Sequence, residues 1–456
     1  EWGGVGWGGA DSRRGLEYAC RMSTTAAAGL SISRRVAGLK PSVTVALTNR
    51  AKELKAAGVD VLGFAAGEPD FDTPDLIKES AIRALREGQT KYAPTLGDMP
   101  TREAIAKKLR EENGIGTGEG GAPKLTGAHV AISAGGKHAL YVAMHCLLDD
   151  PRDREAAGEE PQEVLLPVPA WVSYAPIAEM AGGRVVEIDG PAERDFKITP
   201  EQLRAAITPR SRLLILNSPS NPCGTMYTEA ELREIARVVA EAAATTSPEL
   251  VIISDEIYEK ITYGGIPHFS IGSVPSVAER TLTLNGLSKA YAMTGWRIGY
   301  AAMPGDFGRT LINAMGTLQG QMTTNITSFN YPAIRTALAE AGAEVERMRL
   351  AFAKRAELIH ARLSRIPGVQ CPRPTGAFYA FPDVSALFGK TTPKGVKIAS
   401  ALDLSEALLD EAHVAFVPGE DFGGSGRNCV RISFACSEAQ IEAGMDRFER
   451  FVAGLK

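Results

Sequence analysis

The sequence has few cysteines, and their spacing suits neither disulfide pairs nor zinc ligands. Its 456 residues include six, at Cys20, Cys146, Cys223, Cys371, Cys429 and Cys436, and no C-x-x-C pair occurs. This scatter argues against a disulfide framework or a zinc site and suits a reducing compartment. The six histidines form no metal-binding motif either. We therefore predict a protein without a metal centre.

An excess of charge of one sign is also missing. The chain has 50 Lys and Arg residues against 54 Asp and Glu residues, which gives a net charge of −4. Binding to nucleic acid or to a membrane surface usually needs a strong field of one sign, so neither partner is expected. No apolar run reaches the length of a membrane span. We expect a cytoplasmic protein that acts on small molecules.

The first residues lack the continuous apolar segment of a secretory signal. Residues 1–22, EWGGVGWGGADSRRGLEYACRM, are rich in glycine, and their only methionine is Met22. We interpret residues 1–29 as a disordered N-terminal extension and Met22 as a candidate translation start.

Short apolar runs alternate with helical segments through the middle of the chain. EVLLPV, RLLILN and LVIIS are examples of such runs, and each ends near a candidate functional residue. This pattern is typical of an α/β protein with a mostly parallel sheet covered by helices on both faces. The chain is long enough for two cores. We predict a large domain at residues 71–333 and a smaller α+β domain built from residues 30–70 and 334–456.

The two predicted parts of the smaller domain have different patterns. The first is helical up to Gly58 and then forms a short strand in VDVLGFAAG. The second begins with a long charged helix, AEVERMRLAFAKRAELIHARLSRI, and continues with short strands around GAFYAF, VAFVPG and NCVRISFA. Two hydrophilic stretches, residues 114–128 and 151–163, are rich in Gly, Pro or charge and are interpreted as surface insertions.

A lysine and an arginine stand just beyond the apolar run TLTLNG. They are Lys289 and Arg297. A lysine in apolar surroundings can lose its proton and react with an aldehyde, and a guanidinium matches the geometry of a phosphate. Pyridoxal phosphate carries both groups. Taken alone, the two residues fit an exposed strand end equally well.

The surrounding stretch NGLSKAYAMTGWRIGY, residues 285–300, closely resembles the cofactor-lysine region of class I and II aminotransferases, and in particular the gamma subgroup of aspartate aminotransferases. The resemblance extends from about Leu30 to the C-terminus, with several motifs in the family's order. It implies the fold type I pyridoxal-phosphate-dependent transferase fold, Lys289 as the residue that carries the cofactor covalently, and Arg297 at its phosphate. Gly286 departs from the pattern, because many members have a serine there, and Ser288 is a candidate replacement.

An apolar strand, two glycines and a helix follow one another in HVAISAGGKHALYVAMHCLL. Glycines let the backbone approach a phosphate closely, and the free N–H groups of a helix N-terminus point toward the anion. A lone Gly-Gly pair is weak evidence. The resemblance implies that Gly135, Gly136 and the backbone of Lys137 bind the cofactor phosphate.

Three further motifs follow predicted strands. Trp171 lies in EVLLPVPAWVSY, Asn221 in NSPSNPCG, and Asp255 and Tyr258 in LVIISDEIYEKI. By itself, Trp171 would be interpreted as an ordinary core residue. An anionic carboxylate at the ring nitrogen would keep the pyridinium protonated. The resemblance implies Asp255 for that role, Trp171 stacked on the ring, and Asn221 and Tyr258 at the phenolic oxygen. The backbone before Pro222 is a candidate for a cis peptide bond.

The resemblance also implies residues that contact the substrate. Gly67 in GEPDFDTP and Thr44 in KPSVT are such positions, and Trp171 and Asn221 are implied in the same site. A lone threonine is more often a helix cap. Arg431 occupies the place of the arginine that binds the α-carboxylate, which suits a bidentate guanidinium. The side chain of Lys137 is implied at a distal carboxylate.

Tyr92 lies in the motif KYAP, and from the sequence pattern alone it would be interpreted as a core residue. The resemblance implies that it contacts the cofactor phosphate of a neighbouring subunit, so we expect a homodimer with shared active sites. One departure from the subgroup lies elsewhere in the site, because Ala170 stands where a tyrosine is usual.

The implied activity is transamination between an amino acid, aspartate or glutamate first, and a 2-oxo acid such as 2-oxoglutarate or oxaloacetate. A prephenate aminotransferase that makes arogenate, and a pyridoxal-phosphate-dependent lyase on the same fold, would share the cofactor residues. A non-catalytic regulator would need a DNA-binding domain, and residues 1–29 are too short and too rich in glycine for one.

Overall fold

The structure of the protein is a computed structural model, which describes residues 32–38, 43–118 and 124–456. The predicted extension at residues 1–29, with Met22, lies outside the described residues, as does a part of the hydrophilic stretch at 114–128. None of the helices in the described ranges is both long enough and apolar enough to cross a membrane.

The largest sheet has seven strands in the order β2-β8-β7-β6-β5-β3-β4. In the described chain, β8 is antiparallel to both of its neighbours, β2 and β7, and the other neighbouring pairs are parallel. The strands are β2 (Val130–Ser133), β3 (Glu163–Val168), β4 (Arg184–Asp189), β5 (Ser211–Asn217), β6 (Val251–Asp255), β7 (Thr281–Gly286) and β8 (Gly299–Ala302). The prediction of a mostly parallel sheet is confirmed.

Helices cover both faces of this sheet because successive strand residues point to opposite sides. In β3, Leu166 packs with α6, α8 and α11, whereas Leu165 packs with α9 and α10. The helices of the first face are α6 (Gly136–Leu147), α8 (Tyr174–Met180) and α11 (Gly305–Gly320). The second face is covered by α4 (Asp75–Arg86), α5 (Met99–Asn113), α9 (Pro200–Ala206), α10 (Glu229–Thr245) and α12 (Asn330–Glu340).

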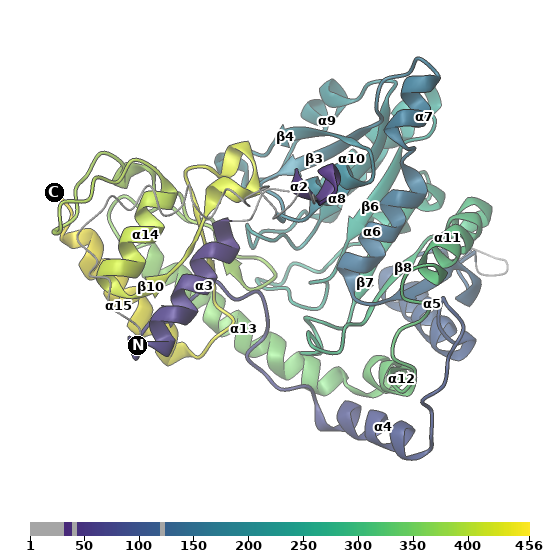
Figure 1. Ribbon diagram of the computed structural model, residues 1–456, viewed down its shortest axis with the longest axis horizontal. Helices are drawn as coiled ribbons and strands as arrows, with labels where there is room; N and C mark the ends of the chain where they lie inside the picture. Colours follow the sequence, from purple (N-terminus) through teal and green to yellow (C-terminus); the bar gives the residue numbers. More distant parts are fainter. Residues whose placement is uncertain (1–31, 39–42, 119–123) are drawn as a thin grey trace, which may run out of the picture.

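A second core lies beside the large sheet. It packs Phe64, Phe352 and Phe448 around two small sheets, one with parallel strands β1 and β10 and one with the antiparallel order β11-β12-β9. These strands are β1 (Leu62–Gly63), β9 (Tyr379–Ala380), β10 (Val414–Ala415), β11 (Val417–Pro418) and β12 (Val430–Ser433), and the helices are α3 (Val43–Ala56), α13 (Gly342–Leu363), α14 (Ala401–Ala412) and α15 (Glu438–Ala453). Figure 1 shows α3, α14 and α15 together at one end of the molecule, with α13 extending from them toward α12.

The second core joins segments from both ends of the chain, in keeping with the predicted smaller domain, and the limits at residues 70 and 333 stay a prediction. Remaining short elements are α2 (Arg34–Ala37), α7 (Pro151–Ala156), η2 (Gly127–His129), η3 (Ala192–Arg194), η4 (Ile271–Ser273), η5 (Ala278–Arg280), η6 (Ser385–Leu387), η7 (Gly419–Phe422) and η8 (Gly424–Gly426).

The structure adds detail to three local predictions. The described part of the region predicted to be helical before Gly58 contains two helices, α2 and α3, and the short strand after it has two residues. The hydrophilic stretch at 151–163 begins with the short helix α7, because Asp150 caps it by accepting a hydrogen bond from the Arg152 N–H at 2.9 Å. The long charged helix is confirmed as α13.

Candidate active site

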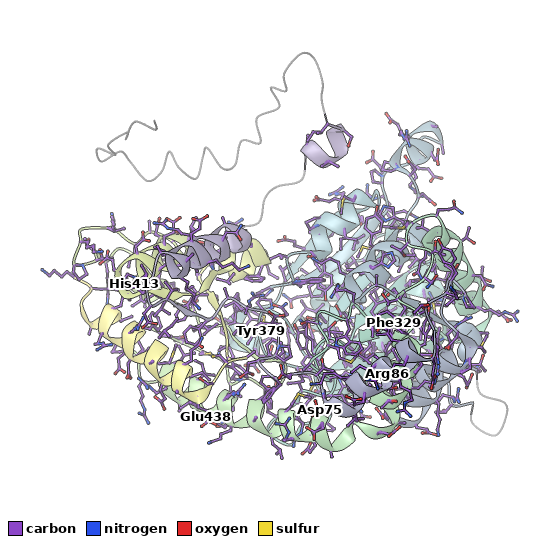
Figure 2. All side chains as sticks on the ribbon, turned by 60° about the horizontal axis from the view of Figure 1, so that its bottom comes forward. Asp75, Arg86, Phe329, Tyr379, His413 and Glu438 are labelled. Carbon is purple, nitrogen blue, oxygen red and sulfur yellow. The ribbon has the colours of Figure 1, made fainter. Side chains whose placement is uncertain are left out.

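A cavity of about 300 Å³ opens where the carboxyl ends of the large sheet meet the small sheets. Asn217 and Asp255 end β5 and β6 and line it, as does Lys289 beyond β7. Tyr379 on β9 and Arg431 on β12 line it from the other side. Figure 2 labels Tyr379 between the region of α15 and the region of α4 and α12. Ligands bind at this edge of α/β sheets in general.

Lys289 presents its amine to this cavity. The Nζ atom donates a hydrogen bond to the carbonyl oxygen of Gly67 and lies 6.0 Å from the ring centre of Phe378. Burial lowers the pKa of Lys289 to about 8, and the nearby guanidinium groups of Arg297 and Arg431 act in the same direction. A larger share of this amine is therefore neutral, and so nucleophilic, at neutral pH than of an ordinary lysine.

The turn before α6 has the geometry of a phosphate cradle. Gly135 has a φ of 91° and stands at the N-cap position of α6. A Cβ at this position would lie 2.5 Å from Nη2 of Arg297, and one at Gly299 on β8 would lie 2.3 Å from the carbonyl carbon of Gly135. Both positions therefore require glycine. The turn brings the helix N-terminus and the guanidinium to one place, which suits an anion.

Asp255 is the buried acid of the site. Its Oδ2 accepts a hydrogen bond from the hydroxyl of Tyr174 at 2.7 Å, and its Oδ1 accepts one from the Ile257 N–H at 3.2 Å. Burial raises the pKa of Asp255 to about 6, although both hydrogen bonds and the charge of Lys289 lower it. A cation in the cavity would favour the ionised form further.

A second network of buried hydrogen bonds and an ion pair stabilises the turn after β6. Glu256 accepts hydrogen bonds from Ser254 at 2.8 Å and from His268, at Nε2, at 3.0 Å. Glu259 forms an ion pair with Lys108. Burial alone would raise the pKa of Glu259, but the charges of Lys108 and His268 lower it to about 2. These contacts hold the segment that carries residues 255 and 258 against the sheet.

Asn221 and Arg431 are joined at the other side of the cavity. The guanidinium of Arg431 donates to Oδ1 of Asn221 at 2.9 Å and to the carbonyl oxygen of Ala65 at 3.1 Å. Because a guanidinium has only donors, this bond turns the amide oxygen of Asn221 toward Arg431 and leaves its NH₂ group free to donate elsewhere. The peptide bond before Pro222 is cis, as predicted.

Aromatic side chains line the rest of the cavity. The hydroxyl groups of Tyr258 and Tyr379 are 3.0 Å apart, and the ring of Tyr379 lies 4.9 Å from the guanidinium carbon of Arg431. Trp171 lies beyond β3, and the Nζ of Lys137 is 4.8 Å from the centre of its ring. Burial lowers the pKa of Lys137, and the charge of Arg297 adds to this effect.

The structure thus brings together most of the residues predicted from the sequence. Those that line the cavity are Gly67, Gly136, Lys137, Trp171, Asn221, Asp255, Tyr258, Lys289, Arg297 and Arg431. Tyr92 lies apart from them and has 90% of its surface exposed. Thr44 lies in the first turn of α3, and its side chain is outside the described residues.

Sequence reasoning missed several residues of the cavity wall, among them Tyr174, Asn217, Asn285 and Tyr379. Asn217 is the first asparagine of NSPSNPCG, and its Oδ1 accepts a hydrogen bond from the Asn221 N–H at 2.8 Å. The motif therefore contained a signal for it. Both tyrosines lie in apolar runs, WVSY and GAFYAF, where they resemble core residues.

Of the two departures from the family pattern, the structure explains Gly286, and nothing in it explains the side chain of Ala170. At Gly286 a Cβ would lie 2.7 Å from the carbonyl oxygen of Ile298, so the close approach of β8 requires glycine there. The neighbouring Ser288 lines the cavity. Ala170 is buried, and its N–H donates to the Phe422 carbonyl oxygen at 2.8 Å, which ties the wall beside Trp171 to η7.

Comparison with known proteins agrees with this geometry. The sequence pattern of the family "Aminotransferase class I and II" matches residues 59–448. The chain belongs to this family. It is 43% identical over 427 residues to aspartate aminotransferase of Geobacillus stearothermophilus, covering 93% of this chain and 99% of that protein. It is 43% identical over 425 residues to aspartate/prephenate aminotransferase of Cereibacter sphaeroides, with the same coverage.

Solved structures of aminotransferases have the same fold. Aspartate aminotransferase from Rhizobium meliloti superposes with a TM-score of 0.84 at 36% identity, covering 94% of this chain and all of that one. The Thermus thermophilus enzyme with maleate superposes with a TM-score of 0.80 at 40% identity, covering 92% and 100%. The predicted aminotransferase fold is therefore confirmed, and membership of this family implies dependence on pyridoxal phosphate.

The cavity contains groups that fit this cofactor. The cradle at Gly135 and Arg297 suits a phosphate, the Lys289 amine suits an aldehyde, and the Asp255 carboxylate suits a ring nitrogen. Two residues of the cavity wall have a buried donor without a hydrogen-bond partner among the described residues, at Nδ2 of Asn285 and Nε of Arg431. A buried donor without a partner costs free energy, so these two side chains add to the polar character of the cavity wall.

Proposed function

We propose that this aminotransferase moves an amino group between aspartate or glutamate and a 2-oxo acid, 2-oxoglutarate or oxaloacetate. The observation that supports this assignment is the pair of cations, Arg431 and Lys137, that line the cavity in addition to Arg297. Their contacts are with neutral groups, an amide and a carbonyl for Arg431 and an indole for Lys137. A dicarboxylic substrate offers one carboxylate to each.

The residues of the cavity then have distinct tasks. When bound, pyridoxal phosphate supplies an aldehyde for the amino group and a ring that accepts electrons. Asp255 would hold a proton at the ring nitrogen, Asn221 and Tyr258 would donate to the phenolic oxygen, and Trp171 would cover one face of the ring. Lys289, once its amine is free, would take the α-proton of the substrate and return it as general base and acid.

The Thermus thermophilus relative with maleate supports a dicarboxylic substrate, because maleate carries two carboxylates. A second candidate is prephenate, since relatives named as aspartate/prephenate aminotransferases are as similar to this chain as those named for aspartate alone. The test is a panel of amino donors against 2-oxoglutarate, oxaloacetate and prephenate. Release of product without an acceptor would indicate a lyase and contradict the proposal.

Lys137 provides a prediction about specificity. Lys137→Ala should lower kcat/KM for aspartate by about one to two powers of ten, because a charge-assisted hydrogen bond is worth roughly 1.5–3 kcal/mol. A neutral donor such as phenylalanine or alanine has no distal carboxylate and should be affected little. Steady-state kinetics with both donors measure the difference.

The binding of the cofactor is the control for this variant. The backbone N–H of residue 137 survives the substitution, so the Kd for pyridoxal phosphate should hardly move. Arg431 is expected to serve every donor through the shared α-carboxylate, and Arg431→Ala should therefore weaken aspartate and phenylalanine alike. Equal losses for both donors in Lys137→Ala would assign that side chain to the phosphate loop.

We also propose a homodimer with shared active sites, supported by the exposure of Tyr92 outside the cavity of its own chain. Mixing an inactive Tyr92→Ala protein with an inactive Lys289→Ala protein should restore part of the activity, because a mixed dimer can hold one site with both residues intact. Activity after proven subunit exchange is the measurement. If exchange restores nothing, each site is complete within one chain.

A further inference from the structure

Tyr174 connects the two residues that would contact the cofactor ring from different sides. Its ring meets Trp171 edge to face, with centres 5.3 Å apart and planes at 86°, and its N–H donates to the Trp171 carbonyl oxygen at 3.0 Å. Its hydroxyl donates to Asp255 at 2.7 Å. Tyr174 begins α8 and is 1% exposed. Its position is therefore fixed by the same core that packs α8 against the sheet.

Each carboxylate oxygen of Asp255 accepts a hydrogen bond, and the two bonds favour the observed orientation. Tyr174 holds Oδ2 and the Ile257 N–H holds Oδ1. An ionised carboxylate can accept about four hydrogen bonds, so each oxygen keeps a free lone pair, and the residue lines the cavity. Without the hydroxyl, Oδ2 would lose its only side-chain donor among the described residues and could rotate away from the ring nitrogen.

We propose that Tyr174 is a positioning residue that holds the Asp255 carboxylate toward the cofactor ring nitrogen and Trp171 toward the ring face. This inference rests on the proposed roles of Asp255 and Trp171. Tyr174 does not touch the reacting atoms itself, and its effect passes through its two neighbours.

The pKa shifts of Asp255 and Tyr174 are consistent with Tyr174 as the hydrogen-bond donor to Asp255. Burial raises the pKa of Asp255 to about 6, and the neighbouring Glu256 raises it too, while Tyr174 and Lys289 lower it. Burial and the Asp255 charge raise the pKa of Tyr174 well above its ordinary value, with a further contribution from Tyr258, so the hydroxyl keeps its proton and remains a donor. Loss of this donor would raise the pKa of Asp255 further, and the carboxyl would be neutral over a wider range of pH.

The test compares Tyr174→Phe with Tyr227→Phe. The control removes a buried hydroxyl of the same kind, which accepts a hydrogen bond from the Ile198 N–H at 3.0 Å and lies outside the cavity. The apoproteins are titrated with pyridoxal phosphate between pH 5 and 8, and the carboxyl infrared band of Asp255, assigned by its loss in Asp255→Asn, is followed over the same range. Thermal unfolding of each protein shows whether it is folded.

Tyr174→Phe should raise the Kd for pyridoxal phosphate about tenfold at neutral pH. The pH below which binding weakens and the pH midpoint of the infrared transition should both rise by about one unit. This size is expected for one lost charge-assisted hydrogen bond. Tyr227→Phe should leave both curves in place. On the Asp255→Asn background, Tyr174→Phe should add little, because it acts through that carboxylate.

Unchanged curves in Tyr174→Phe, equal shifts in both phenylalanine variants, or full additivity with Asp255→Asn would each overturn the inference. The proposed function fails separately, if the parent protein transfers no amino group from any donor. The infrared transition of Asp255 in the apoprotein still decides the role of Tyr174 in that case, because it needs no turnover.

Discussion

Lys289→Ala should bind pyridoxal phosphate but lose measurable transamination. Two proposed functions would disappear together, since we propose that Lys289 holds the cofactor covalently and moves the proton of the substrate. Proton transfer by a positioned group contributes about 10²–10⁴-fold to a rate, so the total loss should exceed this range. The visible absorption of lysine-bound pyridoxal phosphate and its trapping by borohydride are the measurements. The parent protein should be yellow and trap one cofactor per chain at Lys289.

The lowered pKa of Lys289 favours its reaction with the cofactor aldehyde over that of an exposed lysine. Burial lowers it from the ordinary value of 10.5 to about 8. At pH 7 a shift of this size leaves roughly 300 times more neutral amine than an exposed lysine has. Lys197→Ala is a suitable control, because Lys197 is paired with Glu231 at 2.8 Å, and it should retain full trapping. Equal trapping in Lys289→Ala and the parent would mean that another lysine carries the cofactor.

The sequence was informative where function depends on residues at strand ends. Asp255 and Lys289 could be predicted because short apolar runs mark the strands, and polar residues that follow such runs converge at one edge of a parallel sheet. The strand, glycine and helix pattern at Gly135 and Gly136 was visible in the sequence, but only the resemblance to the family assigned these glycines to a phosphate, and that role stays a prediction. Their role depends on close backbone approach, which glycine permits and other residues do not.

The remaining part of the site depends on contacts between distant segments. Tyr379 reaches the hydroxyl of Tyr258 across 121 residues, and Tyr174 reaches Asp255 across 81. Both tyrosines occur in apolar runs, and only the folded arrangement shows which groups their hydroxyls contact. The pairing of Lys108 with Glu259, across 151 residues, is hidden for the same reason. Patterns along a chain report which face a residue is on, but they do not report its partner.

Replacement of Asp255 should have the second largest effect. Asp255→Ala removes the negative charge that would hold a proton on the ring nitrogen, so the ring accepts electrons poorly when the α-proton leaves. Removing one major electrostatic group in a buried site costs about 3–4 kcal/mol, or roughly 10²–10³-fold in kcat. Lys289 would still be able to bind the cofactor. Single-turnover rates with saturating aspartate, on protein shown to be loaded with cofactor, measure the loss.

The pH dependence separates this role from a structural one. In the parent protein, Asp255 accepts a proton as the pH falls through its folded pKa of about 6, so its contribution should be present above that value and fade below it. A bound pyridinium favours the ionised carboxylate and should move this limb to lower pH. Asp255→Asn is close in shape but cannot ionise, so it should be slow at every pH and lack the acid limb. Asp255→Glu keeps the charge and should recover part of the rate, whereas near-parental turnover in the alanine or asparagine variant would show that the ring nitrogen needs no anion here.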